Sequence, residues 1–502
     1  MDNRGKDDPV SASTVTSSDK GLDSRRWWAL AAVSLAAFMT YLDNNIVNVA
    51  IPAIQRDLHL STAGLEWVVS GYILVFASLL LAGGRLADLY GRRRFFSLGL
   101  TIFTGASLAA GLAGSDTVLI AARAVQGLGA ALVTPTTLAI ISATFPDSRE
   151  RTRAVGIWSA VGALALALGP LLGGLLSQHL SWGWIFFVNV PVGLATLALG
   201  QWAIAPDSAS EDARALDVPG LVLSALGLFA LTYALIEGHD RGWTSAPITA
   251  AFATALVALV AFTLVERRSS EPMVDVLLFA NRVFSGGITA IVMWGFGLFG
   301  IYFFTSIYLQ DVLGFSATVA GAAFVPMALL MVVGSITAER VAAGLGAHRS
   351  VGLAMLLMAA GIASLTVLGR DSSFLALMPS FALVGIGGGL SVPLTAMILG
   401  AMPPAQAGVA SGIFNAAREV AGLLGTTVIG AILAARQSAV AGAGHAPLDA
   451  YLSGYRLGLI VAAVLVAAGG VAAFLALRQA PQHPPAEPDD TDDTASELAL
   501  VG

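Results

Sequence analysis

The sequence predicts an all-α polytopic membrane protein with fourteen transmembrane helices. Three observations predict this fold class. First, 56% of the 502 residues are hydrophobic and 12% are charged, whereas soluble domains carry about 25% charged residues. Second, apolar runs of about 20 residues, the length with which a helix crosses a bilayer, recur along the whole chain. Third, the lysines and arginines gather in alternate segments between these runs.

The apolar runs give the candidate spans in order. All of them should be helical, because a bilayer admits only helices and closed barrels, and these runs are too long for barrel strands. The fourteen runs lie at about residues 27–51, 64–83, 95–113, 117–140, 153–177, 183–205, 216–236, 247–265, 284–308, 318–338, 350–368, 374–399, 408–434 and 456–477.

The distribution of positive charge predicts the orientation. If both termini lie in the cytoplasm, the inner segments hold 19 of the 26 lysines and arginines and the outer segments hold five. The other two, Arg123 and Arg418, lie within spans. This inner excess follows the positive-inside rule and would be lost if one span were added or removed. The composition is rich in arginine, alanine and glycine, which favours a bacterial cytoplasmic membrane as the location.

Composition also excludes several classes of function. The chain has no cysteine, so it has no disulfide, thiolate metal site or cysteine nucleophile. Lys6 and Lys20 are its only lysines, and neither closes a phosphate-binding Gly-x-x-x-x-Gly-Lys loop. The six histidines are scattered. We therefore expect no enzyme, no cofactor, no metal and no nucleic-acid partner.

The most informative stretch is the charged loop expected at residues 84–94, between the second and third spans. The stretch has Gly, one variable residue, then Leu-Ala-Asp, two variable residues and Gly-Arg-Arg. This pattern resembles the loop 2–3 signature of the major facilitator superfamily. The resemblance implies a cytoplasmic gate that holds the two halves of a transporter together in the outward-open state. The alternative is a basic anchor that only sets topology. The gate residues would be Gly84, Asp88, Gly91, Arg92 and Arg93.

The resemblance also implies the domain organisation. Transporters of this superfamily have two six-helix halves related by repeats, and fourteen spans leave one extra pair. The polar first residues and the Pro-rich, acidic last residues predict disordered cytoplasmic tails. The expected division is a tail at 1–26, an N-terminal half at 27–205, two extra linker helices with their loops at 206–283, a C-terminal half at 284–478 and a tail at 479–502.

Charged residues inside spans are functional candidates, because burying a charge in a bilayer costs several kcal/mol. Asp43 lies in the first span, in a stretch that resembles the first-helix motif of the 14-span drug:proton antiporters. That motif has Leu-Asp, one variable residue, Thr, two aliphatic residues and then Asn-Val-Ala-Leu-Pro, and Ile51 replaces its Leu here. Asn45 stands where that group usually has Thr. The resemblance implies proton or cation binding by Asp43. The alternative is a carboxylate held by neighbouring asparagines that only packs helices.

Arg123 lies in the fourth span, in a stretch that resembles the fourth-helix motif of the superfamily, with Gln126, Gly127 and Gly129 following at the matching positions. The resemblance implies that Arg123 takes part in proton coupling. A buried guanidinium keeps its charge and so acts on a nearby carboxylate. The alternative is an arginine that reaches to the outer interface. The residues that follow are interpreted as close helix packing.

The fifth span resembles the antiporter motif of the family's exporters, and this stretch predicts the direction of transport. Small residues let helix backbones approach closely, and a proline removes one backbone hydrogen bond and allows a bend. The alternative is ordinary packing by small residues. The matching positions are Gly156, Gly169, Pro170, Gly173 and Gly174, while Ala165 replaces a further glycine.

Arg418 and Glu419 lie near the middle of the thirteenth span, where the related antiporters commonly have Arg-Gln. Glu419 adds an acid that could bind a proton, and Asn415, one turn earlier on the same face, could hydrogen-bond it. Adjacent helical residues point about 100° apart, so Arg418 and Glu419 need not pair. Pairing with another helix is an equal alternative. Aromatic residues such as Trp158 and Trp294 could line a pocket for flat apolar molecules.

These observations predict a proton-coupled antiporter of the 14-span drug:proton family that exports drugs or antibiotics and confers resistance. Its partners would be the lipid bilayer, protons and a small apolar or amphipathic substrate, and it would work as a monomer. The first alternative is a dedicated exporter of a single metabolite or siderophore. A membrane sensor or scaffold that does not transport is a further alternative, which the intramembrane charges disfavour.

Overall fold

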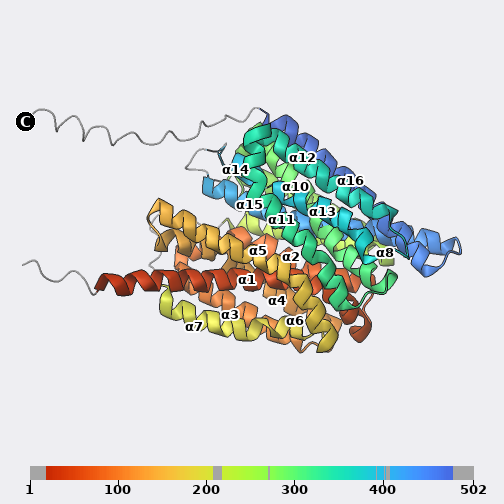
Figure 1. Cartoon of the computed structure of the whole chain (residues 1–502), viewed down its shortest axis with the longest axis horizontal. Coiled ribbons are helices and arrows are strands. Elements are labelled where there is room, and N and C mark those ends of the chain that lie inside the picture. Colours follow the sequence, from red (N-terminus) through yellow and green to blue (C-terminus); the bar gives the residue numbers. More distant parts are fainter. Residues whose placement is uncertain are drawn as a thin grey trace, which may run out of the picture.

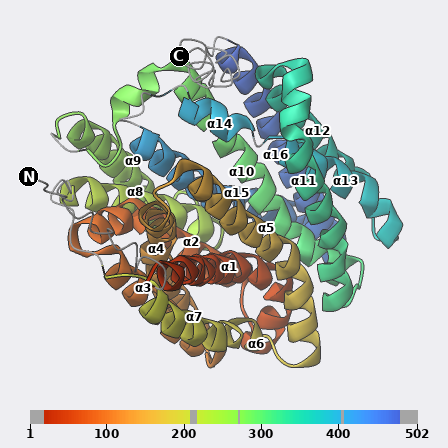
Figure 2. The same ribbon diagram turned by 60° about the vertical axis from the view of Figure 1, so that its left-hand side comes forward.

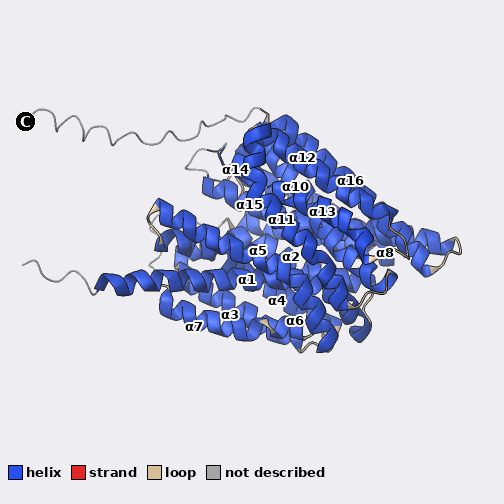
Figure 3. Ribbon diagram, viewed as in Figure 1, coloured by secondary structure: helices blue, strands red, loops and turns tan. Residues whose placement is uncertain are grey.

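The computed structural model describes residues 18–206, 217–269, 272–391, 393–400, 402 and 407–478, and this part of the chain is helical without a strand (Figure 3). Of the tails expected at 1–26 and 479–502, residues 1–17 and 479–502 lie outside the described residues. The first helices are α1 (Ser18–Leu58), α2 (Thr62–Tyr90), α3 (Arg92–Gly111), α4 (Asp116–Thr144), α5 (Ser148–His179), α6 (Trp184–Phe187), α7 (Asn189–Ala203), α8 (Val218–Arg241) and α9 (Ala246–Glu266).

The second part of the chain begins with a short 3₁₀ helix, η1 (Val276–Ala280), and a long helix that ends in a π-helical turn. Its remaining elements are α10 (Arg282–Ile307), η2 (Tyr308–Val312), α11 (Ala317–Leu345), α12 (Ala347–Ser364), η3 (Leu365–Val367), α13 (Phe374–Leu390), α14 (Pro393–Gly400), α15 (Ala407–Gly442) and α16 (Pro447–Leu477).

The predicted all-α fold with many membrane-spanning helices is confirmed. Within the described ranges, thirteen helical segments are long and apolar enough to cross a membrane, and each matches one predicted span. The other predicted span, 95–113, is α3, whose mean hydropathy is lowered by the arginines of its first turn. Helix α3 packs along α4 and α7 and buries Phe96, Leu100 and Phe103. We therefore interpret α3 as the third span.

Three boundaries differ from the expected ones. Helix α1 begins at Ser18, so residues 18–26, which we assigned to the tail, are helical. The span expected at 374–399 is divided into α13 and α14, because proline at the start of α14 lacks the N–H that a continuous helix requires there. The loop expected at 84–94 is a turn of one residue, because α2 continues to Tyr90 and α3 starts at Arg92.

The helices pack in two groups, seen on the two sides of Figure 1. In the first group, α2 and α3 lie against α4, and α1 lies against α5 and α7. In the second group, α10 lies against α15 and α16, α12 against α13 and α16, and α11 against α13. Helices α8 and α9 pair with each other, and α8 also contacts α2 and α15, one helix of each group (Figure 2).

The two groups are in close contact at the end of the bundle where α1 and α5 finish. There α5 packs on α11, and the Thr318 amide donates a hydrogen bond to Gln178 Oε1 at 2.9 Å. Gln310 Nε2 donates to the backbone carbonyl of Val49 at 2.8 Å, which joins η2 to α1. The opposite end, where α2 turns into α3, is where the groups diverge in Figure 1. Among the described residues, these contacts close the bundle at the end where α1 and α5 finish.

Gly91 makes the one-residue turn possible, because its φ of 102° lies in the region that side chains disfavour. We expect Gly91→Ala to destabilise the protein by about 1–3 kcal/mol, the strain of a non-glycine residue in such a conformation. Thermal unfolding of the purified protein measures this. Gly105→Ala on the same helix pair is the control, since a Cβ there meets nothing within 4 Å. Equal melting temperatures for the two variants would contradict the strained turn.

Candidate functional site

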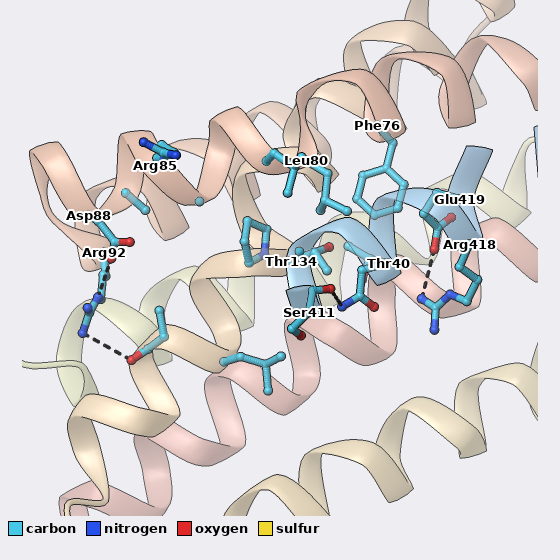
Figure 4. Close-up of a pocket in the computed structure, with 18 of the residues that line it drawn as sticks. Thr40, Phe76, Leu80, Arg85, Asp88, Arg92, Thr134, Ser411, Arg418 and Glu419 are labelled. Carbon is cyan, nitrogen blue, oxygen red and sulfur yellow. Dashed lines mark hydrogen bonds and ion pairs between the residues drawn. The ribbon is translucent and has the colours of Figure 1, made fainter. Parts of the chain in front are cut away.

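A cavity of about 660 Å³ lies between the two groups of helices. Figure 4 shows it reaching from Arg418 and Glu419 on α15 to Asp88 and Arg92 at the α2–α3 turn. Its wall combines aromatic, aliphatic and amide side chains from five helices. These include Thr40, Tyr41 and Asn44 on α1, Tyr72, Phe76 and Leu80 on α2, Thr134 and Leu138 on α4, Trp158 on α5, and Ser411 and Asn415 on α15.

Asp43 and Arg123 form a fully buried ion pair behind this wall. Both side chains have an exposed fraction of 0%, and Arg123 Nη1 lies 2.5 Å from Asp43 Oδ2. The two residues are 80 positions apart in the chain, so the packing of α1 beside α4 is what brings them together. A buried ion pair is stable only if hydrogen bonds satisfy its remaining polar atoms. The surroundings supply them to Asp43 and to every guanidinium nitrogen of Arg123 except Nη2.

The other oxygen of Asp43 accepts two amide hydrogen bonds. Gln126 Nε2 and Asn189 Nδ2 each donate to Asp43 Oδ1 at 2.7 Å. Ser107 on α3 accepts from Gln126 at 2.8 Å, so four helices converge on one carboxylate. We interpreted Gln126 as helix packing and gave Asn189 no role, yet both hold Asp43. The signal for Gln126 was its position one turn after Arg123 on the same helix face.

Arg123 links this buried network to the cavity. Its Nε donates to the carbonyl of Val68 at 3.1 Å, and its guanidinium carbon lies 4.3 Å from the centre of the Tyr72 ring. That ring packs beside Phe76, and both residues line the cavity. Arg123 Nη2 is buried without a hydrogen-bond partner. A change at Asp43 can therefore reach the cavity through the Arg123–Tyr72 contact.

Arg418 and Glu419 pair with each other in the cavity wall. Arg418 Nη2 lies 3.0 Å from Glu419 Oε1, because both side chains are long enough to bend across the angle between adjacent residues. The hydrogen bond expected between Asn415 and Glu419 does not form: Asn415 Nδ2 donates instead to the carbonyl of Ser411 at 2.9 Å. Unlike Asp43, Glu419 lines the cavity directly.

The expected gate residues lie at the end of the cavity. Arg92 Nε lies 3.1 Å from Asp88 Oδ1, and Gly84, Asp88 and Arg92 all line the cavity. Arg93 donates to the carbonyl of Gln201 on α7 at 2.5 Å. These contacts of Asp88, Arg92 and Arg93 join helices of the first group to one another. In this conformation the motif therefore braces one group at the mouth of the cavity.

The glycines of α5 lie against two neighbours. A Cβ on Gly169 or Gly173 would overlap Asn45 or Ile46 of α1. A Cβ on Gly174 would overlap the carbonyl of Ala317 on α11, and Gly321 of α11 approaches the Pro170 carbonyl in the same way. Gly156 meets nothing within 4 Å. Four of the five motif positions thus permit close packing, and Gly174 and Pro170 do so at the closed end of the bundle.

The predicted aromatic pocket residues are only partly confirmed, because Trp158 lines the cavity and Trp294 does not. Within the ranges that the structure describes, no group of three or more histidine, aspartate or glutamate side chains has a metal-binding arrangement.

The buried pair predicts a strong energetic coupling. Asp43→Asn and Arg123→Met should each destabilise the protein by about 3–5 kcal/mol, because each leaves a buried charge without its partner. The double variant should be less destabilised than the sum by about 1–3 kcal/mol. Thermal unfolding of the four proteins measures this. Asp88→Asn is the control, and its partly exposed pair with Arg92 should contribute less than about 1 kcal/mol. Strict additivity of Asp43→Asn and Arg123→Met would contradict the pairing.

The α5–α11 contact predicts that a larger residue at Gly174 keeps the closed end from closing. Because the chain has no cysteine, Gln310→Cys supplies a single thiol at the buried α1–η2 contact. We expect Gly174→Val to raise the rate at which an impermeant maleimide labels this thiol. Gly156→Val is the matched control on the same helix and should leave the rate unchanged. Equal labelling in both variants would show that Gly174 does not control closure.

Comparison with known proteins agrees with this architecture. Residues 33–426 match the family model described as Major Facilitator Superfamily. The chain is 40% identical to the multidrug resistance protein Stp of Mycobacterium tuberculosis (82% of this chain, 76% of that protein). It is 36% identical to the puromycin resistance protein pur8 of Streptomyces alboniger (88% and 90%). It is 37% identical to the tetracenomycin C resistance and export protein of Streptomyces glaucescens (83% and 77%).

Solved structures share the fold at low identity. A bacterial homologue of the human lysosomal transporter Spinster, inward-facing and unoccupied, has a TM-score of 0.63 at 18% identity and covers 91% of this chain and 98% of its own. The POT family transporter PepTSo has a TM-score of 0.66 at 15% identity, with 90% and 98% covered. With the family match over most of its length, this chain is a multi-pass membrane protein that belongs to the major facilitator superfamily.

Proposed function

We propose that this protein is a proton-coupled antiporter that exports drugs or antibiotics across the bacterial cytoplasmic membrane and thereby confers resistance. One observation carries the proposal: a cavity with a largely apolar wall ends against Tyr72, and Tyr72 covers the buried Asp43–Arg123 pair. The similar proteins named for multidrug resistance, puromycin resistance, and tetracenomycin C resistance and export support the same function. The protein is a transporter and not an enzyme in this proposal.

The cavity suits a small apolar or amphipathic substrate. Phe76, Leu80 and Trp158 offer ring and aliphatic surface, and Asn44 and Asn415 offer amide groups that orient a polar part of the molecule. The charges of Arg418 and Glu419 compensate each other at 3.0 Å. The wall therefore selects by shape and apolar area more than by substrate charge.

Protons act on the same cavity in the proposed cycle. A proton on Asp43 removes the negative charge that holds Arg123, so the guanidinium shifts against Tyr72 and the cavity wall changes with it. Protonation of Glu419 would free Arg418 in the same way. Substrate is released outward from the protonated state, and loss of the proton to the cytoplasm restores the pair. The energy comes from the proton gradient alone.

The proposal includes an orientation of the protein in the membrane. Both termini lie in the cytoplasm, the cavity faces the cytoplasm, and the α5–α11 contact closes the outer side. The division into 27–205, 206–283 and 284–478 follows the two groups of helices and the α8–α9 pair. The Asp88–Arg92 turn at the mouth of the cavity acts as the cytoplasmic latch once the groups come together there. The protein works as a monomer.

Transport by inverted membrane vesicles tests the proposal. An imposed pH gradient should drive accumulation of a fluorescent lipophilic dye, and an uncoupler should abolish it. Asp43→Asn should lower this accumulation by about tenfold or more, since it removes one coupled proton site. Glu419→Gln in parallel shows which acid carries the proton. Proton-driven accumulation that is unchanged in Asp43→Asn would remove Asp43 from the cycle.

A dedicated exporter of a single metabolite or siderophore remains the second candidate. Relatives named for one compound each, puromycin or tetracenomycin C, favour it. Competition separates the two candidates. In a multidrug exporter, chemically unrelated drugs should inhibit accumulation of one another. A dedicated exporter would transport one compound, and unrelated drugs would not inhibit its accumulation.

A further inference from the structure

A second cavity, of about 450 Å³, lies at the closed end of the bundle, away from the α2–α3 turn. Helices α2, α8 and α15 form its wall, with Gln55 from the end of α1. Its lining is polar, and the side chains that matter below are Glu66 on α2 and His239 and Asp240 on α8. Because α8 belongs to the extra helix pair, this cavity exists only in the presence of that pair.

Glu66 is a buried carboxylate without a compensating charge. Its exposed fraction is 3%, and among the described residues no ion pair or hydrogen bond reaches it, with Oε2 completely enclosed. The other two acids singled out inside spans differ, since Asp43 pairs with Arg123 and Glu419 with Arg418. An ionised carboxylate buried in this way costs several kcal/mol, whereas the neutral acid costs far less.

The other titratable groups that line the cavity around Glu66 are His239 and Asp240. From α8 come Asp240, which is exposed, and His239, whose Nε2 lies 2.8 Å from Ser438 Oγ of α15. Glu237 of α8 binds the Trp67 indole and Arg241. The described wall from α15 and α1 contributes no titratable side chain, and no lysine or arginine lines the cavity. An ionised Glu66 would therefore have neither a lysine nor an arginine beside it in this cavity.

Gly430 of α15 shows how tightly the helices close over this acid. A Cβ at that position would overlap Oε1 of Glu66, so α15 lies directly on the carboxyl group. If α2 and α15 separate when the outer side opens, Glu66 meets water and can ionise. When they close again, the carboxyl group must be neutral to fit against the α15 backbone without a partner.

We propose that Glu66 is a proton-binding site, loaded from the outer side through the cavity that α8 completes, and that its protonation permits closure of α15 on α2. The inference rests on the proposed proton-coupled transport, which it deepens by adding a site beyond Asp43 and Glu419. It assigns a function to the extra helix pair α8–α9, because His239 and Asp240 of α8 form the outer wall of the route along which the proton reaches Glu66.

Difference infrared spectroscopy of the full-length protein in liposomes tests the site without relying on transport. The wild type should show the C=O stretch of a buried carboxylic acid at neutral pH, shifted by deuterium exchange. Glu66→Gln should remove that band and fold normally, because glutamine resembles the neutral acid in shape and charge. Asp116→Asn, an exposed acid at the same end of the bundle, is the matched control and should retain the band. A spectrum unchanged by Glu66→Gln overturns the inference.

Transport provides the second test. Glu66→Gln should bind dye with an unchanged Kd but lower proton-driven accumulation by about tenfold, the order expected for one coupled site. It should also lose the dependence of the rate on outer pH, and Asp116→Asn should retain both. Wild-type rates and pH dependence in Glu66→Gln overturn the inference, even if the infrared band is lost. Absence of any proton-driven transport in the wild type would instead overturn the proposed function.

Discussion

The Asp43–Arg123 ion pair is the constraint on which the first group of helices depends. Two fully buried charges in a membrane protein require hydrogen bonds that compensate for their lost hydration. Each atom that donates or accepts such a bond must lie at a defined position. Gln126 must follow Arg123 by one turn, and Asn189 must face α1 from α7. Ser107 places α3 in the same network. The packing of four helices is thus specified by one carboxylate and not by apolar contact alone.

Close backbone approach is the complementary constraint between the two groups. Gly174 and Gly321 let α5 and α11 meet at one end of the bundle, and Gly430 lets α15 lie on Glu66 of α2. At the other end, the cavity separates the groups as far as Asp88. Packed interfaces switch between discrete arrangements and do not deform continuously. Small residues at these contacts therefore suit a protein that alternates between two arrangements, each closed at a different end of the bundle.

Much of this arrangement could be predicted from the sequence, and the remainder has physical reasons. Hydropathy and the arginine distribution predict fourteen helices, and motif spacing picked out Asp43 and Arg123 separately. Their pairing could not be predicted, because sequence distance does not reveal which helices are neighbours. The expected 84–94 loop was wrong, since Arg85 and Asp88 continue α2 and only Gly91 turns. Glu66 was missed because it lies near the first residue of the apolar run 64–83, where a single acid resembles an interfacial residue. Only the packing of α8 and α15 shows that it is covered.

The most direct test of the account is the proton released when substrate binds. Purified protein in weakly buffered detergent solution is mixed with a dye that the vesicles accumulate, and the change in pH is recorded beside that of Asp43→Asn, with binding of the dye checked in both. A coupling role of the Asp43–Arg123 pair predicts clearly more proton release by the wild type than by the variant. Equal release by two proteins that bind the dye equally would contradict a role for the Asp43–Arg123 pair in coupling.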